Sequence, residues 1–254
     1  MAAAAWAITP FVGLVVVWSV VAGARLVPAV WLPGPELVVR AGWAQLRSGV
    51  LVEDVLISLA RLLAGFGMGA GLGILLGLAM GTNRYIAMCF DPIANFFQSI
   101  GGIAWIPLAV LWFGFGWGSV LFVIVNTVFF IVLFNTLAGV EAVPRNLIHS
   151  SLTLGAGRWT VICEVLVPGA LPSLVNGLRL GMGFGWRALI AAEMIAASSG
   201  VGFRIYDAAA YWKSEEILWG LIVIGTLWMA TDGLILRPLE AKTVERWGLV
   251  QPGG

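Results

Sequence analysis

Long apolar runs alternate with short polar intervals along the chain. Six of these runs approach the roughly 20 residues that an α-helix needs to cross the hydrocarbon core of a membrane. They occupy residues 8–27, 55–81, 92–111, 120–138, 172–197 and 217–236. The strands of a membrane barrel would show segments of about 10 residues with alternating polarity, which this sequence lacks. The pattern therefore predicts an all-α polytopic membrane protein with about six transmembrane helices, forming a single domain over residues 1–254.

The first run has two interpretations. Ala22-Gly23-Ala24 matches the small-residue pattern at which signal peptides are cleaved. However, no Lys or Arg precedes the run, and the run is longer than the apolar region of a signal peptide. We therefore expect an uncleaved first span.

Composition agrees with a membrane protein and narrows its chemistry. Hydrophobic residues make up 60% of the chain, charged residues make up 11%, and the mean hydropathy is +0.98, which excludes an ordinary soluble domain. The formal net charge of +1 gives no basic surface for nucleic acid. One histidine and two distant cysteines, Cys89 and Cys163, do not supply the clustered ligands of a metal or haem site. We expect a chain that is not an enzyme and holds no cofactor.

The second apolar run carries a glycine at every fourth residue. These glycines are Gly65, Gly69, Gly73, Gly77 and Gly81, and they lie on one face of the predicted helix. Lipid provides no hydrophobic drive for helix association, so small residues at this spacing mark faces where two helices approach closely. We expect this helix to be packed inside the bundle.

Polar groups interrupt the later runs. Such groups are tolerated at membrane depth where they face protein or a water-filled cavity, and intramembrane charges often mark a transport pathway. In this interpretation Arg187, beside Trp186, binds a planar or oxyanionic solute. In the alternative, Arg187 forms an ion pair with Glu193 or Asp232 on a neighbouring helix. The pathway candidates are Asn95, Gln98, Ser99, Gly102, Trp105, Asn135, Arg179, Trp186, Arg187 and Glu193.

A polar interval, residues 139–168, predicts two short amphipathic helices. Pro144 suits the first turn of the first helix, and Gly155 suits its end. A second helix is expected from Arg158 until Pro168 stops it. We interpret the interval as a docking surface for a partner protein, with an ordinary interfacial loop as the alternative. The residues of this surface are Pro144, Arg145, Leu147, Ile148, His149, Ser150, Ser151, Leu154, Gly155 and Arg158.

Several short motifs occur in order over nearly the whole chain. Gly155 is followed by nine residues and then by Val165-Leu166-Val167-Pro168. Other motifs are Trp31-Leu32-Pro33-Gly34-Pro35, Ser58–Phe66, Ala104–Leu108, Leu111–Gly116, Gly177–Gly181, Ala191-Ala192-Glu193 and Asp232–Glu240. Together they resemble the membrane subunit of type I ABC importers, in the branch of sulfonate, taurine, nitrate and bicarbonate permeases. The spacing after Gly155 is that of the family's cytoplasmic motif.

The chain departs from that family at three places. His149-Ser150-Ser151 stands where the family has Glu-Ala-Ala. Gln98-Ser99-Ile100-Gly101-Gly102 stands where it has Arg-x-Ile-Pro-Pro, and Phe129-Phe130-Ile131 stands where it has Phe-Phe-Pro. The last two segments lie where a solute would pass, so the solute cannot be inferred from a relative.

The resemblance implies the type I ABC importer permease fold, with six spans in the lipid of the plasma (inner) membrane and both termini in the cytoplasm. It also implies a homodimer of this subunit, two ATP-binding subunits that hold Mg-ATP, and an extracytoplasmic solute-binding protein. The sequence has no G-x-x-x-x-G-K-[ST] phosphate loop, which agrees with a separate ATPase. The expected function is ATP-driven, alternating-access uptake of a small anion: a sulfonate or taurine, nitrate, bicarbonate or an aromatic acid.

Three points stay open at this stage. Basic residues alone do not orient the chain, because six fall on one side of the predicted spans and five on the other. In the implied orientation, Gly200–Asp207 is either a plain external loop or a contact for the binding protein. The alternative functions are a secondary transporter not coupled to ATP, which would need a coupling-ion site, and a permease for a neutral solute such as a vitamin precursor.

Overall fold

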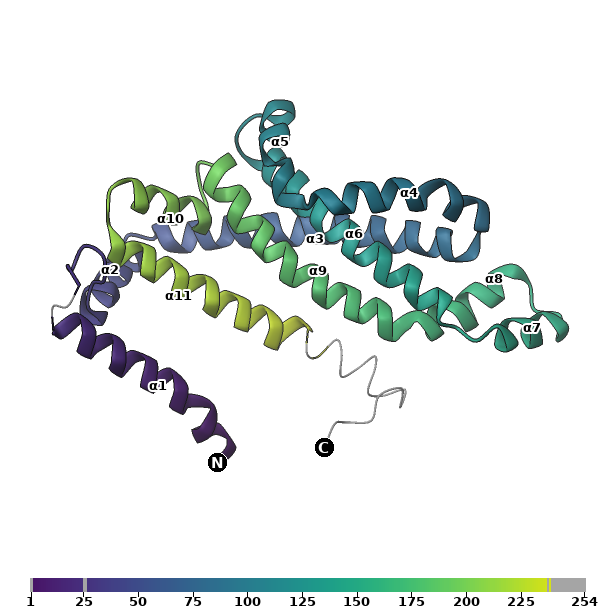
Figure 1. Cartoon of the computed structure of the whole chain (residues 1–254), viewed down its shortest axis with the longest axis horizontal. Coiled ribbons are helices and arrows are strands. Elements are labelled where there is room, and N and C mark those ends of the chain that lie inside the picture. Colours follow the sequence, from purple (N-terminus) through teal and green to yellow (C-terminus); the bar gives the residue numbers. More distant parts are fainter. Residues whose placement is uncertain (1, 25–26, 237, 239–254) are drawn as a thin grey trace.

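The chain forms an elongated bundle of helices in a computed structural model that describes residues 2–24, 27–236 and 238. Figure 1 shows α10 and α2 toward one end of the bundle and α7 and α8 at the other. Part of the predicted motif Asp232–Glu240, residues 237, 239 and 240, lies outside the described residues. The helices are α1 (Ala2–Gly23), α2 (Pro35–Arg47), α3 (Val50–Thr82), α4 (Arg84–Ile100), η1 (Gly102–Trp105), α5 (Ile106–Phe113), α6 (Trp117–Glu141), α7 (Arg145–Thr153), α8 (Arg158–Val161), η2 (Ile162–Leu166), α9 (Val167–Ala196), α10 (Val201–Ala210), α11 (Ser214–Thr231) and η3 (Asp232–Leu236).

The predicted all-helical membrane fold is confirmed. Among the described residues, four helices are long and apolar enough to span a membrane: Val50–Thr82, Trp117–Glu141, Arg158–Ala196 and Ser214–Leu234. A fifth candidate is the pair Arg84–Ile100 and Gly102–Phe113, which is bent by 83°. Residues 25–26 of the first predicted span lie outside the described residues, and α1 contributes the shorter apolar stretch Val12–Gly23.

Two helix boundaries differ from the sequence prediction. The third span begins at Arg84 rather than at residue 92, because the Asn83 side chain caps the helix by accepting a hydrogen bond from Tyr85 N at 2.9 Å. Pro168 does not stop the helix that starts at Arg158, which continues through the π-helical turn η2 into α9. Pro168 is the second residue of α9 after that turn, where the α-helical hydrogen-bond ladder is already interrupted, so the proline is tolerated.

α6 lies between α3 and α9, and glycines on both outer helices bring their backbones close to it. A Cβ at Gly73 would lie 2.7 Å from Phe129 O, and one at Gly177 would lie 2.5 Å from the Asn135 Cβ. Both distances are shorter than side chains allow, so only glycine fits. The predicted close packing of the second span is confirmed. The α6 residues enclosed between its neighbours include Val120, Val123, Ile124, Val128 and Val132.

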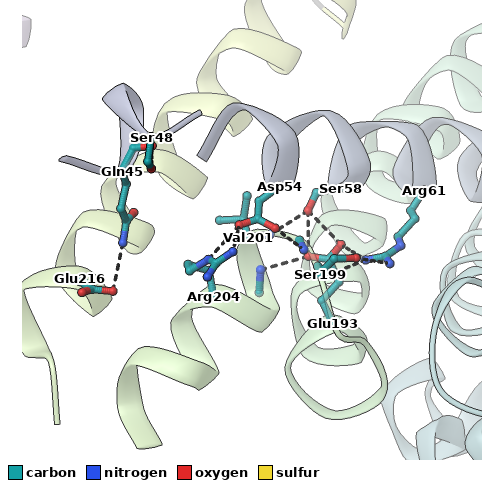
Figure 2. Close-up of polar contacts among 12 residues, drawn as sticks. Gln45, Ser48, Asp54, Ser58, Arg61, Glu193, Ser199, Val201, Arg204 and Glu216 are labelled. Atoms are coloured by element: carbon teal, nitrogen blue, oxygen red, sulfur yellow. Dashed lines mark hydrogen bonds and ion pairs between the residues drawn. The ribbon is translucent and has the colours of Figure 1, made fainter. Parts of the chain in front are cut away.

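A buried ion pair joins α3 to α9 (Figure 2). Arg61 Nη1 lies 2.8 Å from Glu193 Oε1, and the two side chains are 2% and 0% exposed. Ser58 Oγ lies 2.9 and 2.8 Å from the two carboxylate oxygens, and Gly202 N donates to Oε2 at 3.0 Å. Arg61 also donates to Ser199 O at 2.7 Å. These partners offset the hydration that both charged groups lose on burial.

The same network ties α10 to α3 (Figure 2). Asp54 accepts hydrogen bonds from Gly200 N at 2.8 Å and from Arg204 Nε at 2.9 Å. Gly200 has φ +108°, and a Cβ there would overlap the Glu193 carboxylate, so the turn between α9 and α10 requires glycine. This end of the bundle is therefore held by polar contacts among three helices.

The glycines of α3 and α9 that pack against α6 form what we call the glycine seam. The seam predicts that a substitution at one glycine of α3 destabilises the fold, whereas a substitution at a nearby glycine outside the seam does not. We expect Gly73→Val to lower the free energy of unfolding by about 1–3 kcal/mol, because its side chain collides with the α6 backbone. Gly71→Val is the matched control, since a Cβ at Gly71 meets nothing within 4 Å. The apparent melting temperatures of the detergent-purified variants measure the difference, and equal values would contradict the seam.

The buried pair predicts a large cost for removing one partner. Arg61→Met leaves the Glu193 carboxylate buried without its cation, which costs about 3–5 kcal/mol of stability. The double variant Arg61→Met/Glu193→Leu should recover part of that loss. Arg40→Met is the control, because its pair with Glu36 is exposed and contributes about 0–1 kcal/mol. Chemical unfolding in detergent gives the comparison, and an Arg61→Met variant as stable as Arg40→Met would refute the argument.

Candidate functional site

The chain bends sharply between α4 and α5. Gly101 ends α4 at φ +72°, a backbone conformation that favours glycine. Pro107 lies in the first turn of α5, where its missing N–H breaks no helical hydrogen bond. A Cβ at Gly102 would overlap the Oγ1 atom of Thr127 on α6. The bend therefore rests directly against α6.

A pocket of about 420 Å³ lies beside this bend, and we call it the bend pocket. It draws its walls from α4, the bend, α6 and α9. Of the predicted pathway residues, Gln98, Gly102 and Asn135 line it. The full lining is Phe97, Gln98, Gly101, Gly102, Asn126, Thr127, Phe130, Ile131, Phe134, Asn135, Leu180 and Phe184.

Uncharged amides supply much of the polarity of the bend pocket. Asn135 Nδ2 donates to the backbone of its own helix at 2.8 Å, and its Oδ1 accepts from Asn176 Nδ2 on α9 at 3.2 Å. The amides of Gln98 and Asn126 have no hydrogen-bond partner within the described part of the chain. Their donors and acceptors are thus available to a polar solute.

An exposed stripe on α9 leads from the bend pocket to a cation. Leu180 and Phe184 line the pocket, and Arg187 follows within the next turn. Arg187 is exposed, and its Cζ lies 5.1 Å from the centroid of the Phe184 ring, in cation–π contact. Arg187 also lines a second pocket of about 540 Å³ between α9 and α11, together with the buried Trp186 and with Trp228.

Three predicted pathway residues of the broken span do not line the bend pocket. The side chains of Asn95 and Ser99 donate to backbone carbonyls of α4 at 2.9 and 2.7 Å. The Trp105 ring packs against Phe97, with 5.6 Å between ring centroids. These residues contribute to helix and aromatic packing at the bend.

Two of the three predicted charges of α9, Glu193 and Arg179, form ion pairs with residues outside this helix. Glu193 belongs to the buried pair with Arg61, and Arg179 Nη2 lies 3.6 Å from Asp232 Oδ1. Neither Glu193 nor Arg179 lines the bend pocket. The two ion pairs considered for Arg187 are therefore not formed, because other arginines engage both carboxylates.

Sequence reasoning missed part of the α6 wall. Asn126, Thr127 and Phe134 line the bend pocket and were not among the predicted residues. The signal that could have found Asn126 is its polarity within an otherwise apolar helix, a property it shares with the predicted Asn135. Their spacing does not group them, because nine residues make two and a half helical turns and place the two Cα atoms on opposite sides of α6.

The polar interval forms α7 and α8 at the end of the bundle away from α10 (Figure 1). Ile148 packs against a small buried core at this end, and Gly155, at φ +87°, follows the end of the first helix. Leu147 and Leu154 are 50% and 87% exposed, and Trp159 is 79% exposed. Large apolar side chains exposed on otherwise polar helices are typical of surfaces that contact another molecule.

The polar residues predicted for the docking surface lie around the same two helices. Pro144 directly precedes α7 rather than lying in its first turn, and α7 contains no acidic residue. Ser151 is half-buried and donates to Leu147 O at 2.8 Å. The residues that are exposed are Arg145, His149, Ser150 and Arg158.

Comparison with known proteins identifies the family. Residues 69–236 match the family described as binding-protein-dependent transport system inner membrane component. The taurine transport system permease protein TauC of Escherichia coli is 34% identical over 243 residues, which cover 94% of this chain and 88% of TauC. The nitrate import permease protein NrtB of Synechocystis is 33% identical over 182 residues, which cover 72% of this chain and 66% of NrtB.

A solved structure shares the fold. A chain of the MetNI methionine ABC transporter, in an inward-facing conformation, matches with a TM-score of 0.61 at 21% identity, over 75% of this chain and 96% of that chain. The resemblance noted in the short motifs is thereby confirmed over most of the sequence. This chain belongs to the binding-protein-dependent transport system inner membrane component family, as a multi-pass permease subunit of an ABC importer in the inner membrane, and it is not an enzyme.

Proposed function

We propose that this permease subunit carries a small anionic solute and that the bend pocket is part of the path. The observation that carries the proposal is Arg187, an exposed cation on the α9 stripe next to the pocket. Charged side chains within spans are costly and are kept where they face a cavity or a partner. A sulfonate or taurine, nitrate, bicarbonate or an aromatic acid each fits this description.

The chemistry of the pocket suits transient binding of an anion. The guanidinium of Arg187 forms charge-assisted hydrogen bonds with oxyanions. Amides such as those of Gln98 and Asn126 donate neutral, weaker hydrogen bonds. A path needs binding that is favourable enough for entry and weak enough for release, and one cation with several amides meets that requirement.

Two copies of the chain would enclose the path. Leu180, Phe184 and Arg187 are exposed in a single chain, although they lie on α9, whose opposite side packs against α6. A second copy that faces this stripe would cover it and would place a second Arg187 across the path. A symmetric pair of permease subunits is the simplest arrangement in which the bend pocket becomes an enclosed route.

α7 and α8 supply the contact with a separate ATPase subunit that holds Mg-ATP. Through this contact the ATPase would open the bend pocket to the two sides of the membrane in turn. The exposed Leu147, Leu154 and Trp159 suit an apolar slot on that partner. The helix that starts in this interval, Arg158–Ala196, runs on to the stripe beside the bend pocket. A force applied at α8 therefore acts on the pocket wall through one helical element.

This scheme implies an orientation. The α7 end faces the cytoplasm, with both termini on that side, and α10 faces outward. Gly200–Asp207 then meets an extracytoplasmic solute-binding protein that delivers the solute. The network of Asp54 with Gly200 and Arg204 would hold this contact surface in place.

If α7 couples the permease to the ATPase subunit, replacing the exposed leucines of α7 with charged residues should weaken binding of that subunit. We expect Leu147→Asp/Leu154→Asp to reduce the amount of ATPase subunit that co-purifies by roughly tenfold, because a buried, unpaired carboxylate costs more than the 1.4 kcal/mol that corresponds to tenfold. Tyr211→Asp is the control, since Tyr211 is exposed and directly follows α10, which lies toward the opposite end of the bundle (Figure 1). A double variant that keeps its ATPase, with turnover still stimulated by the binding protein, contradicts the coupling role.

The substrate role of Arg187 predicts a specific transport defect. Arg187→Gln should lower uptake of the anion by reconstituted transporter roughly tenfold, the value of one charge-assisted hydrogen bond, while Arg187→Lys keeps part of the activity. Arg179→Gln on the same helix is the matched control, because Arg179 pairs with Asp232. Unchanged uptake in an assembled Arg187→Gln transporter would exclude the role and favour a neutral solute.

A further inference from the structure

A second polar pocket lies between α7 and the adjacent ends of the spans. Its volume is about 660 Å³, and we call it the arginine pocket. Nine apolar side chains form much of its wall: Met80, Ala87, Val140, Val143, Ile148, Leu152, Val161, Ile162 and Leu166. Gly81, Thr82, Arg84, Glu141, Arg145 and Arg158 complete it. The pocket therefore combines apolar surface with a concentration of charge.

The charge of the arginine pocket is unbalanced. Arg84, Arg145 and Arg158 carry three positive charges, whereas Glu141 carries the one negative charge. In the part of the chain that the structure describes, none of the four forms an ion pair within 4 Å. All four side chains are exposed. A bound anion would relieve the repulsion among the arginines.

Two of these arginines stand where a cation is unfavourable for the isolated helix. Arg84 is the first residue of α4 and Arg145 is the first residue of α7, and neither helix has an acidic residue in its first turn. The positive end of a helix dipole repels such a cation. An anion in the pocket would be attracted both by the guanidinium groups and by these helix ends.

We propose that the arginine pocket binds a phosphate group, supplied by the headgroup of an anionic phospholipid. Guanidinium groups recognise phosphate through paired, charge-assisted hydrogen bonds. The apolar wall favours an amphiphile over a free ion, because it can cover the glycerol and the first acyl carbons. The pocket also lies where the spans α3 and α6 end, at Thr82 and Glu141, and the ends of spans are where a chain meets lipid headgroups. Basic pockets between transmembrane helices at this depth bind anionic headgroups.

The site does not depend on which solute is transported, but two of its arginines, Arg145 and Arg158, also belong to the docking surface predicted for a partner protein. Bound lipid would lie between α7 and the ends of the spans and would brace the docking surface against the membrane-embedded helices. If the coupling role of α7 holds, ATP turnover should then rise with the anionic lipid content of the bilayer. Lipid binding itself can be measured without that assumption.

The test measures which phospholipid the full-length chain retains. The protein is placed in nanodiscs of equal parts phosphatidylglycerol and phosphatidylcholine, released in the mass spectrometer, and the bound lipids are counted. Wild type should retain phosphatidylglycerol in preference by roughly tenfold, as expected for several basic groups near one headgroup. Arg84→Gln/Arg145→Gln/Arg158→Gln should lose that preference, and the corresponding triple lysine variant should keep most of it. Arg40→Gln is the control, because Arg40 is an exposed arginine of α2, a helix that lies toward the other end of the bundle (Figure 1).

A second arm separates the sources of phosphate. In nanodiscs of phosphatidylcholine alone, inorganic phosphate is compared with chloride at equal ionic strength for its effect on the melting temperature. Stabilisation by inorganic phosphate that depends on the arginines, without a phosphatidylglycerol preference, would support the phosphate site and assign it to soluble phosphate. The proposal is overturned if wild type and the triple glutamine variant respond alike to both ligands. It is equally overturned if the triple glutamine variant keeps the phosphatidylglycerol preference but no longer co-purifies with the ATPase subunit. The arginines would then bind carboxylates on that protein.

Discussion

The close approach of α3 and α9 to α6 is the constraint on which the rest of the structure depends. Apolar side chains gain nothing by leaving lipid, so helices in a membrane associate through packing at short range. Glycines on both outer helices bring the backbones to that range, and the valines of α6 fill the seam. The pair of Arg61 and Glu193 adds a directional contact that forms only when α3 and α9 are correctly rotated and aligned. This three-helix unit supports the bend pocket along its length and the proposed docking surface at one end.

Much of the fold could be predicted from the sequence, because the length and polarity of a run are properties of the chain itself. The length of each apolar run predicted the helical spans, and glycines at every fourth residue predicted the close packing of α3. Boundaries that depend on local hydrogen bonding could not be predicted in the same way. Asn83 starts a helix eight residues before the apolar run, and Pro168 is accepted because the π-helical turn η2 precedes it.

Side-chain partners were harder to predict because they depend on which helix faces meet. Glu193 is bound by Arg61, which lies 132 residues earlier in the chain. The sequence itself argues against an ion pair between Glu193 and Arg187, because residues six apart on one helix lie on different faces. Gln98, Gly102 and Asn135 were predicted as pathway residues, and they do line one pocket. Gln98 and Asn135 are polar residues within apolar helices, and Gly102 belongs to a pair of glycines that breaks one. Both features are visible in the sequence, whereas the packing that encloses Glu193 is not.

The central claim is that the bend pocket belongs to a path whose access alternates with ATP binding. The most direct measurement is the accessibility of Asn135→Cys to a membrane-impermeant thiol reagent in the assembled transporter, with the exposed Cys89 and Cys163 replaced by serine. Leu75→Cys, which is exposed on α3, is the control for a position outside the pocket. Labelling of Asn135→Cys from one side of the membrane should be strong without nucleotide and fall severalfold when ATP is bound, while Leu75→Cys does not change. Labelling of Asn135→Cys that is the same in both states, from either side, would contradict the account.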